Sequence, residues 1–356
     1  MHLSKNQLIT FALNQGVQNL LHRTPWLNYR FSKPTFVIFQ LNDACNLRCQ
    51  QCNFWKFREM GMPTEKVVEG LKKLKEWLGP FHLTLTGGET LLRPDIADLV
   101  REASSLGLMV HLLTNGTLLT ERTAAGLHDA HLSLCTVSLD GATAPTHDRL
   151  RGREGTYGKV IENIRRAKQH LRIQLAAILF KDNLGEAAGI VHLAEQEGLA
   201  GVLFQPVLMD FTGKAAPGDT IPYHLLPDSP AAVSKALENL ISMKKKGSPI
   251  NNSIGHLRLM ESYLKNPFAP LGAFPSNEGL SSILILPNGD IDFSFGRKKS
   301  PLNIYTSVNL RKAWISPEIM HLRKKANREG GADALCNCSY RRPLTEKFAD
   351  FMNSLW

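Results

Sequence analysis

The chain of 356 residues is long enough for one large domain and a smaller one. With 43% hydrophobic and 21% charged residues it has a globular composition, which excludes wholesale disorder, and six cysteines are too few for a disulfide scaffold. The formal net charge is +10, but the basic residues are scattered, so an anionic substrate or an acidic protein partner is favoured over nucleic acid.

Residues 1–34 form an N-terminal extension. Its apolar residues follow helical spacing and Pro25 ends the helix, so we expect a helix that packs on the body of the protein. Peripheral membrane contact is less favoured, because the polar positions are mostly Asn and Gln. The apolar run 8–13 is too short for a signal peptide, and no run reaches the roughly 20 residues of a membrane span. A cytoplasmic location is therefore expected, where thiols stay reduced.

Residues 35–246 alternate short apolar segments with amphipathic ones. The expected strands are 36–41, 82–86, 109–114, 134–138, 173–179 and 202–205. The expected helices are 64–77, 94–106, 120–128, 157–170 and 183–197, with Pro94 at a first helical position. This order predicts an α/β fold, a partial (β/α)6 TIM-like barrel, with ligands at the carboxyl ends of the strands.

Residues 247–356 have a different character and predict a small α+β C-terminal extension. Before it lie an irregular, proline-rich segment at 206–228 and a helix at 229–246. A helix at 251–264 is followed by two short strands, 283–286 and 291–295, which flank a hairpin turn at 287–290. A last helix and a tail complete the chain.

Three cysteines follow the first strand directly, in Cys45-Asn-Leu-Arg-Cys49-Gln-Gln-Cys52. A loop of this length can wrap three thiolates around one face of a [4Fe–4S] cube, whose usual protein ligands are thiolates. A structural zinc site would need a fourth nearby ligand, and no His or Cys lies between Cys52 and His82. The spacing favours an iron–sulfur site, with zinc and inert thiols left as alternatives.

Polar or glycine-rich segments end the next three strands. Gly87-Gly88-Glu89 follows the second strand, Asn115 the third, and Ser138-Leu-Asp140-Gly the fourth. Paired glycines let the backbone approach a ligand closely, while Ser138 and Asp140 alternate with Leu139 and so share one face. Each segment alone is also an ordinary turn, but together they line one rim.

In this order and spacing, the CxxxCxxC motif, the Gly-Gly-Glu segment, the Ser-Leu-Asp-Gly segment and residues 147–152 resemble the radical S-adenosylmethionine (SAM) superfamily. The chain is most similar to the branch of the molybdenum-cofactor cyclase, the sulfatase-maturing enzymes and the peptide cross-linker of pyrroloquinoline quinone synthesis. The C-terminal region resembles a degenerate SPASM or twitch extension. It retains only Cys336 and Cys338, so we expect no auxiliary cluster there.

The resemblance implies a role for each motif. Cys45, Cys49 and Cys52 would bind the [4Fe–4S] cluster and serve as the catalytic centre. The residues implied in SAM binding are Gly87, Gly88, Glu89, Asn115, Ser138, Asp140, Arg151 and Phe54. Arg149 competes with Arg151 for the carboxylate of SAM, and Phe54 or Trp55 would stack on adenine because Gln51 replaces the family's usual aromatic residue. Asn183 and Gln205 are weaker candidates for lining the same ligand-binding end of the barrel.

The implied activity is reductive cleavage of SAM to a 5′-deoxyadenosyl radical that abstracts hydrogen from a substrate. A flavodoxin- or ferredoxin-like electron donor is implied as partner. A small-molecule biosynthetic intermediate is slightly preferred as substrate over a peptide, and lipid-linked chemistry is a further alternative. A non-catalytic iron–sulfur redox sensor is the competing class. Cys135, inside an apolar strand, is expected to be a buried structural thiol.

Overall fold

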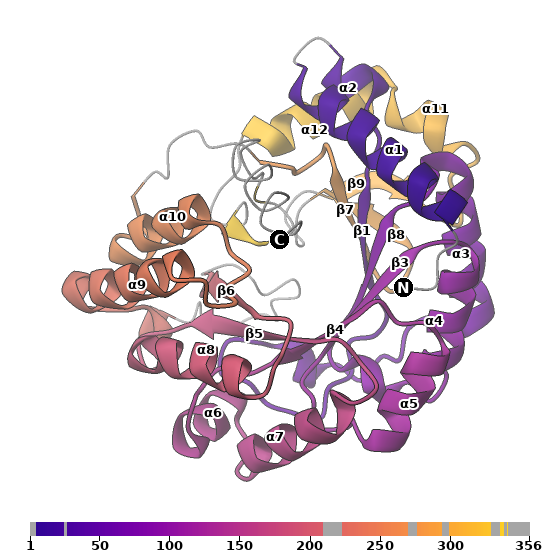
Figure 1. The fold of residues 1–356 in the computed structure, drawn as a ribbon. Coiled ribbons are helices and arrows are strands. Elements are labelled where there is room, and N and C mark those ends of the chain that lie inside the picture. The colour runs from indigo at the N-terminus through magenta and orange to yellow at the C-terminus, as the bar shows by residue number, and fades with distance from the viewer. Residues whose placement is uncertain are drawn as a thin grey trace.

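A computed structural model describes residues 5–24, 27–208, 223–269, 276–293, 299–328, 335–337 and 340. Its centre is a run of parallel strands whose neighbours in the sheet are also neighbours in the sequence. They are β1 (Phe36–Gln40), β2 (His82–Thr86), β3 (Met109–Thr114), β4 (Leu134–Ser138), β5 (Ile173–Leu179) and β6 (Val202–Pro206). The strands curve into an open arc, and the sheet does not close (Figure 1). The predicted partial (β/α)6 barrel is confirmed.

Helices cover the convex face of this arc (Figure 1). They are α3 (Thr64–Leu78), α4 (Ile96–Ser105), α5 (Glu121–Asp129), α6 (Ala144–Arg151), α7 (Thr156–Ala167), α8 (Ala187–Gln196), α9 (Pro230–Lys245) and α10 (Ile254–Lys265). Short 3-10 turns occur at η1 (Phe54–Lys56), η2 (Thr90–Leu92), η3 (Leu184–Glu186) and η4 (Tyr223–Leu225).

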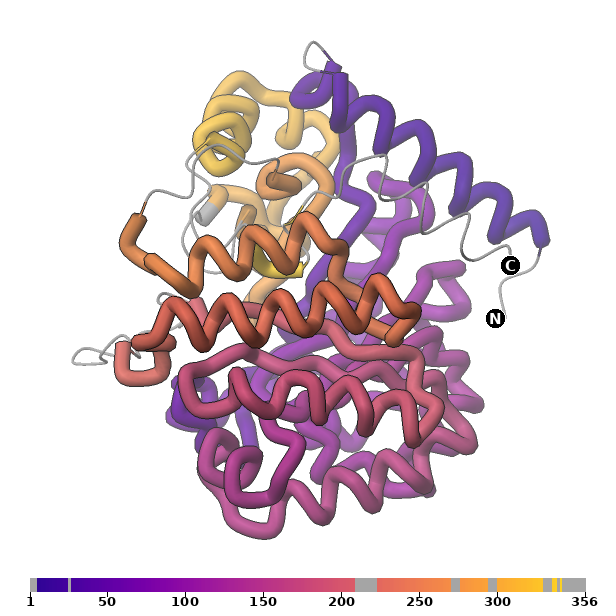
Figure 2. The backbone as a smooth tube through the Cα atoms, turned by 60° about the vertical axis from the view of Figure 1, so that its left-hand side comes forward, coloured from indigo at the N-terminus to yellow at the C-terminus, as the bar shows by residue number. Residues whose placement is uncertain are grey.

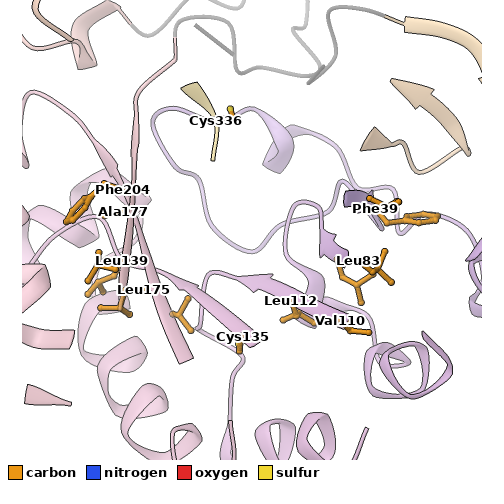
Figure 3. Packing of buried hydrophobic residues seen from close by; sticks show 14 of the residues in the cluster. Phe39, Leu83, Val110, Leu112, Cys135, Leu139, Leu175, Ala177, Phe204 and Cys336 are labelled. Carbon is orange, nitrogen blue, oxygen red and sulfur yellow. The ribbon is translucent and has the colours of Figure 1, made fainter. Parts of the chain in front are cut away.

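One face of the strands and the inner faces of these helices form a continuous hydrophobic core. Leu83, Val110, Leu112 and Leu175 are among its fully buried members (Figure 3). Cys135 belongs to the same core with no exposed surface, which confirms the expected structural thiol. The alternation of these residues with polar ones along each strand leaves the opposite face to the interior of the arc.

The C-terminal strands extend the barrel sheet. The strand β7 (Ser282–Ile285) pairs in parallel with β1, from Phe36 opposite Ser282 onward. Antiparallel pairing then adds β8 (Asp290–Asp292) and β9 (Lys299–Asn303), so the predicted hairpin is confirmed. The helices α11 (Leu310–Trp314) and α12 (Pro317–Arg328) follow. The predicted boundary at residue 247 thus precedes strands that share one sheet with residues 35–246.

The N-terminal extension packs on the body, as expected. It contains α1 (Lys5–Arg23) and the single turn α2 (Asn28–Phe31). The Asn14 side chain donates to the carbonyl of Pro80 at 2.8 Å, and Phe11 meets the ring of His82 edge-on at 4.6 Å. Within the described residues, no helix combines the length and apolarity needed to cross a membrane.

Three local predictions differ from the structure. The helix expected at 183–197 is divided into the 3-10 turn η3 and helix α8. Helix α6 was not among the predicted elements, although Pro145 in its first turn and left-handed Gly152 after its end are ordinary helix signals. Helix α4 begins at Ile96 and not at Pro94, so the prediction for Pro94 was wrong. The preceding turn is held by Asp95, whose carboxylate pairs with Arg93 at 2.6 Å.

Candidate active site

The cysteine loop, which we define as residues 41–53 between β1 and η1, is attached to the end of β2. Its backbone bonds continue the sheet: the Leu41 amide donates to the Thr86 carbonyl at 2.7 Å, and the Glu89 amide donates to the Ala44 carbonyl at 2.8 Å. The Gly88 amide donates to the Asn42 carbonyl at 3.0 Å. Backbone hydrogen bonds therefore fix the position of the first cysteine, and these bonds do not depend on the neighbouring side chains.

Gly87 and Gly88 permit this close approach. A Cβ atom on Gly88 would lie 2.3 Å from the carbonyl oxygens of Asp43 and Ala44, which are backbone atoms of the cysteine loop. A Cβ on Gly87 would lie 2.4 Å from the Asn42 carbonyl oxygen, and the φ of Gly87 is +154°. Any side chain here would push the loop off the strand end.

Glu89 also has a structural role that the sequence did not predict. Its buried carboxylate accepts hydrogen bonds from the Thr114 hydroxyl at 2.6 Å, the Asn115 amide at 2.6 Å and the Leu91 amide at 2.9 Å. Burial raises the pKa of Glu89, and these donors oppose that shift. The side chain thereby ties the end of β2 to the end of β3.

Helix α6 holds the other side of the cysteine loop. The Gln50 amide donates to the Leu150 carbonyl at 3.1 Å, and the Arg48 amide donates to the Arg151 carbonyl at 3.3 Å. Gly152, in left-handed conformation at φ +67°, lies against the Arg48 carbonyl, where a Cβ would approach to 2.1 Å. The loop is thus fixed between the end of β2 and the end of α6.

Arg151 extends from α6 to the middle cysteine. One guanidinium nitrogen lies 3.8 Å from Cys49 Sγ, and the other pairs with Asp140 Oδ2 at 2.8 Å. Asp140 Oδ1 accepts from the Ile178 amide at 2.9 Å, which fixes the carboxylate against β5. Arg149 instead pairs with Asp182 at the surface. The structure therefore separates the two arginines that the spacing left in competition.

The three cysteines are free thiols. Burial raises the pKa of Cys45 to about 11 and that of Cys52 to about 12, and it also raises the pKa of Cys49, which the nearby Arg151 guanidinium opposes. Without a metal these buried sulfurs stay protonated, because desolvation disfavours the thiolate. Among the described residues, no three His, Cys, Asp or Glu side chains form a group suited to a single metal ion.

The other predicted SAM residues lie after the end of β3, at the end of β4 and in η1. Asn115 donates to the Asn46 side chain at 2.8 Å and lies 4.0 Å from Cys45 Sγ. Ser138 is half-buried at the end of β4, next to Ala176 of β5. Phe54 is half-buried in η1, while the more exposed Trp55 lies beneath the Arg48 guanidinium at 5.8 Å.

Two weaker candidates have structural partners. Asn183 is buried and donates to the Asp140 and Ile178 carbonyls, both at 2.7 Å, so it closes a turn and does not line an open mouth. Gln205 lies 3.7 Å from Cys336 Sγ, which is itself buried near the inside of the arc (Figure 3). Cys338, residues 294–295 of the second predicted hairpin strand and residues 209–222 of the predicted irregular segment lie outside the described residues.

These features define a class. The carboxyl ends of β1 to β4 bring a three-cysteine loop, a glycine pair and a buried Arg–Asp pair to one edge of an open parallel barrel. Residues 39–194 match the family model described as the radical SAM superfamily. Residues 39–194 therefore carry a radical SAM domain, a family characterised by a [4Fe–4S] cluster and SAM, and the chain is similar to enzymes such as a heme synthase and a GTP 3′,8-cyclase.

The chain spans only about half of the length of the curated relatives that it matches. The AdoMet-dependent heme synthase of Methanosarcina barkeri is 30% identical over 223 residues, 60% of this chain and 59% of that protein. The PqqA peptide cyclase of Rhodopseudomonas palustris is 30% identical over 167 residues, 46% of this chain and 44% of that protein. The crystal structure of Streptococcus suis SuiB is similar in fold, with a TM-score of 0.66 at 16% identity over 90% of this chain and 74% of SuiB.

Proposed function

We propose that this chain is a radical SAM enzyme that binds a [4Fe–4S] cluster through Cys45, Cys49 and Cys52 and binds SAM at the ends of β2 to β4. The observation that carries the proposal is the buried Arg151 guanidinium, which lies between Cys49 Sγ at 3.8 Å and Asp140 Oδ2 at 2.8 Å. A buried cation needs compensation: Asp140 provides it, and a cluster-bound thiolate at Cys49 would add to it.

The donor set fits an iron–sulfur cube. Three free thiols lie within eight residues on a loop that is held from both sides. In a cube each cysteine binds a different iron, so the sulfurs need not converge on one point. Metal binding ionises thiols that burial otherwise keeps neutral, and iron provides that driving force. Three protein ligands leave one iron available for SAM.

The remaining residues support binding and orientation. The amides of Gly88 and Glu89 are used by the cysteine loop, and the Glu89 carbonyl accepts from the Asn42 side chain at 3.0 Å, so the carbonyls of Gly87 and Gly88 are the ones that would meet an ammonium group. Arg151 offers a guanidinium to a carboxylate, and Phe54 offers an apolar ring at the same loop. When bound, the cluster supplies the electron that cleaves the sulfonium of SAM. The protein fixes the reactants and excludes water.

The first test is anaerobic reconstitution with iron and sulfide, followed by reduction with dithionite in the presence of SAM. We expect a cluster absorbance band and SAM-dependent 5′-deoxyadenosine, both lost in Cys45→Ala, Cys49→Ala and Cys52→Ala. Cys135→Ala is the matched control, since this buried thiol lies in the hydrophobic core. Calorimetry with SAM distinguishes an enzyme from a non-catalytic redox sensor, because a sensor that only shares the fold is not expected to bind SAM. A reconstituted chain without SAM binding would overturn the proposal.

For the substrate we propose a polar small molecule. The inner face of the arc carries a hydrogen-bonded row in which His111 Nε2 lies 2.6 Å from the Thr136 hydroxyl, and the Gln174 amide donates to that hydroxyl at 3.1 Å. Burial lowers the pKa of His111 to about 4, so its imidazole is neutral at pH 7. Such a row offers neutral donors and acceptors, as a site for a polar compound requires.

A peptide is the second candidate, favoured by the fold likeness to SuiB, which has been crystallised bound to its precursor peptide SuiA. An extract of the native host, added to the reduced enzyme with SAM, separates the two. If the substrate is a small molecule, stimulation of 5′-deoxyadenosine formation survives exhaustive proteolysis of the extract. If stimulation disappears with proteolysis, the peptide candidate replaces it.

A further inference from the structure

Helix α1 is fixed to the barrel by polar side chains. Asn14 donates to the Pro80 carbonyl at 2.8 Å, and Gln15 donates to the Thr35 carbonyl at 3.3 Å. Gln18 accepts from the Lys33 amide at 2.7 Å. Phe11 is the one buried apolar residue of the helix, while Leu8 and Leu21 are half-buried. The inward face of α1 is therefore mostly polar, the reverse of an ordinary amphipathic surface helix.

The outward face carries the apolar residues. Ile9, Leu13, Val17 and Leu20 are 58%, 64%, 55% and 69% exposed. Their spacing of four, four and three residues places them in one row along the helix, which we call the apolar stripe. Single exposed hydrophobic residues are common on protein surfaces, but a continuous row is typical of a binding surface. On the neighbouring α2, Phe31 is also 56% exposed.

The charged residues of the N-terminal extension have one sign. Residues 5–34 contain Lys5, Arg23, Arg30 and Lys33 and no Asp or Glu. Lys5 and Arg23 are the two ends of α1, so a cationic residue lies beyond each end of the stripe. Between them the helix has no charged side chain. The surface therefore combines an apolar row with positive ends.

We propose that α1 lies on the surface of an anionic lipid bilayer and inserts the apolar stripe among the lipid headgroups. A helix of 19 residues, about 28 Å long, lies in the interface plane in this way when its apolar residues enter the membrane and its cations meet anionic headgroups. A second copy of the chain fits less well. Antiparallel pairing of two α1 helices would bring Lys5 of each beside Arg23 of the other, and like charges repel.

The position of α1 gives this contact a direction. Its bonds reach Thr35 and Pro80, which precede β1 and β2, so the helix crosses the amino-terminal ends of these strands. The cysteine loop follows the carboxyl end of β1, at the other end of the barrel. Figure 2 shows α1 along the outer edge of the molecule. A bilayer under α1 therefore leaves the cysteine end of the barrel facing away from the membrane.

The experiment is flotation of the full chain with vesicles of phosphatidylcholine, alone or mixed with phosphatidylglycerol. We expect binding to the mixed vesicles, weakened by added salt. The double variant Leu13→Gln/Leu20→Gln should bind at least about tenfold more weakly, since two exposed leucines no longer enter the lipid. Val308→Gln is the matched control, because Val308 is fully exposed on the C-terminal extension and should not matter.

Both variants should keep the circular dichroism spectrum and melting temperature of the parent, because the replaced side chains contact water. The proposal is overturned if the parent does not float with anionic vesicles, or if the double variant floats equally well. It is also overturned if light scattering shows a dimer that the double variant converts to a monomer, since the stripe then binds a second copy. Neither readout depends on the cluster or on SAM, so the proposed enzyme activity stands or falls separately.

Discussion

Arg149 and Arg151 lie two residues apart on α6, yet they meet different environments. Arg149 forms a half-exposed ion pair with Asp182, whereas the buried Arg151 reaches Asp140 and Cys49. Burial acts on Arg151 against its charge, but Asp140 and the cysteine sulfurs outweigh it and raise its pKa. The guanidinium therefore stays charged, and its role depends on keeping both neighbours.

We expect Arg151→Ala to lower the free energy of unfolding by about 3–5 kcal/mol, because it leaves the Asp140 carboxylate buried without a counter-charge. Arg149→Ala should change it by less than about 1 kcal/mol, as for an exposed ion pair. Urea unfolding of the two variants measures the difference. Adding Asp140→Asn to Arg151→Ala should restore part of the loss. Equal effects of the two arginine variants would show that the buried pair does not matter.

At the scale of elements, the cysteine loop depends on backbone contacts more than on its own sequence. It is pressed against Gly88 on one side and Gly152 on the other, and a side chain at either position would meet a carbonyl oxygen of the loop. Both glycines therefore act as spacers between elements that are far apart in the sequence.

Gly88→Ala should destabilise the chain by about 1–3 kcal/mol, as expected for overpacking against backbone that cannot move aside. It should also reduce the iron bound after reconstitution, because the loop is displaced. Gly158→Ala is the control: Gly158 lies within α7 with no atom near its Cβ position, so alanine should stabilise by about 0.5–1 kcal/mol. Thermal unfolding and iron analysis measure the two effects. Normal iron content in Gly88→Ala would contradict this account of the loop.

The sequence predicted most of these elements but few of their contacts. Strands such as β3 are short apolar runs that periodicity identifies well, and CxxxCxxC is a specific motif. The contact of the Glu89 side chain with the end of β3 has no local signal in the sequence, because its partners Thr114 and Asn115 lie 25 and 26 residues away. The polar inward face of α1 was also not predictable, since apolar spacing indicates a helix without showing which face is buried.

At the scale of the whole molecule, Arg323 connects the N-terminal extension with the C-terminal region. It lies on α12 with no exposed surface, and its guanidinium donates to the carbonyls of Gly279 at 2.7 Å and Tyr29 at 2.8 Å. It also stacks over the ring of Trp314 at 3.8 Å. Burial lowers its pKa to about 9. Because β7 pairs with β1, these contacts fasten the C-terminal helices to a sheet that already includes the barrel.

This continuity predicts that the elements from β7 to α12 unfold together with the barrel. Arg323→Ala leaves buried carbonyls without donors and should cost on the order of 3 kcal/mol. The loss should appear as one transition, shifted to lower urea for the entire chain. With Trp26, Trp55 and Trp356 replaced by Phe, tryptophan fluorescence reports on the contact of Trp77 with Trp314, whose rings lie 5.3 Å apart. Far-ultraviolet circular dichroism reports mainly on the helices of the barrel.

Coincident curves from the two probes, in the parent and in Arg323→Ala, indicate one cooperative unit. Lys325→Ala is the control, because this exposed residue of the same helix should leave the midpoint unchanged. If the fluorescence change instead precedes the change in circular dichroism, the C-terminal region is a separate folding unit. The pairing of β7 with β1 would then be too weak to couple them, and the sheet would be continuous in geometry but not in stability.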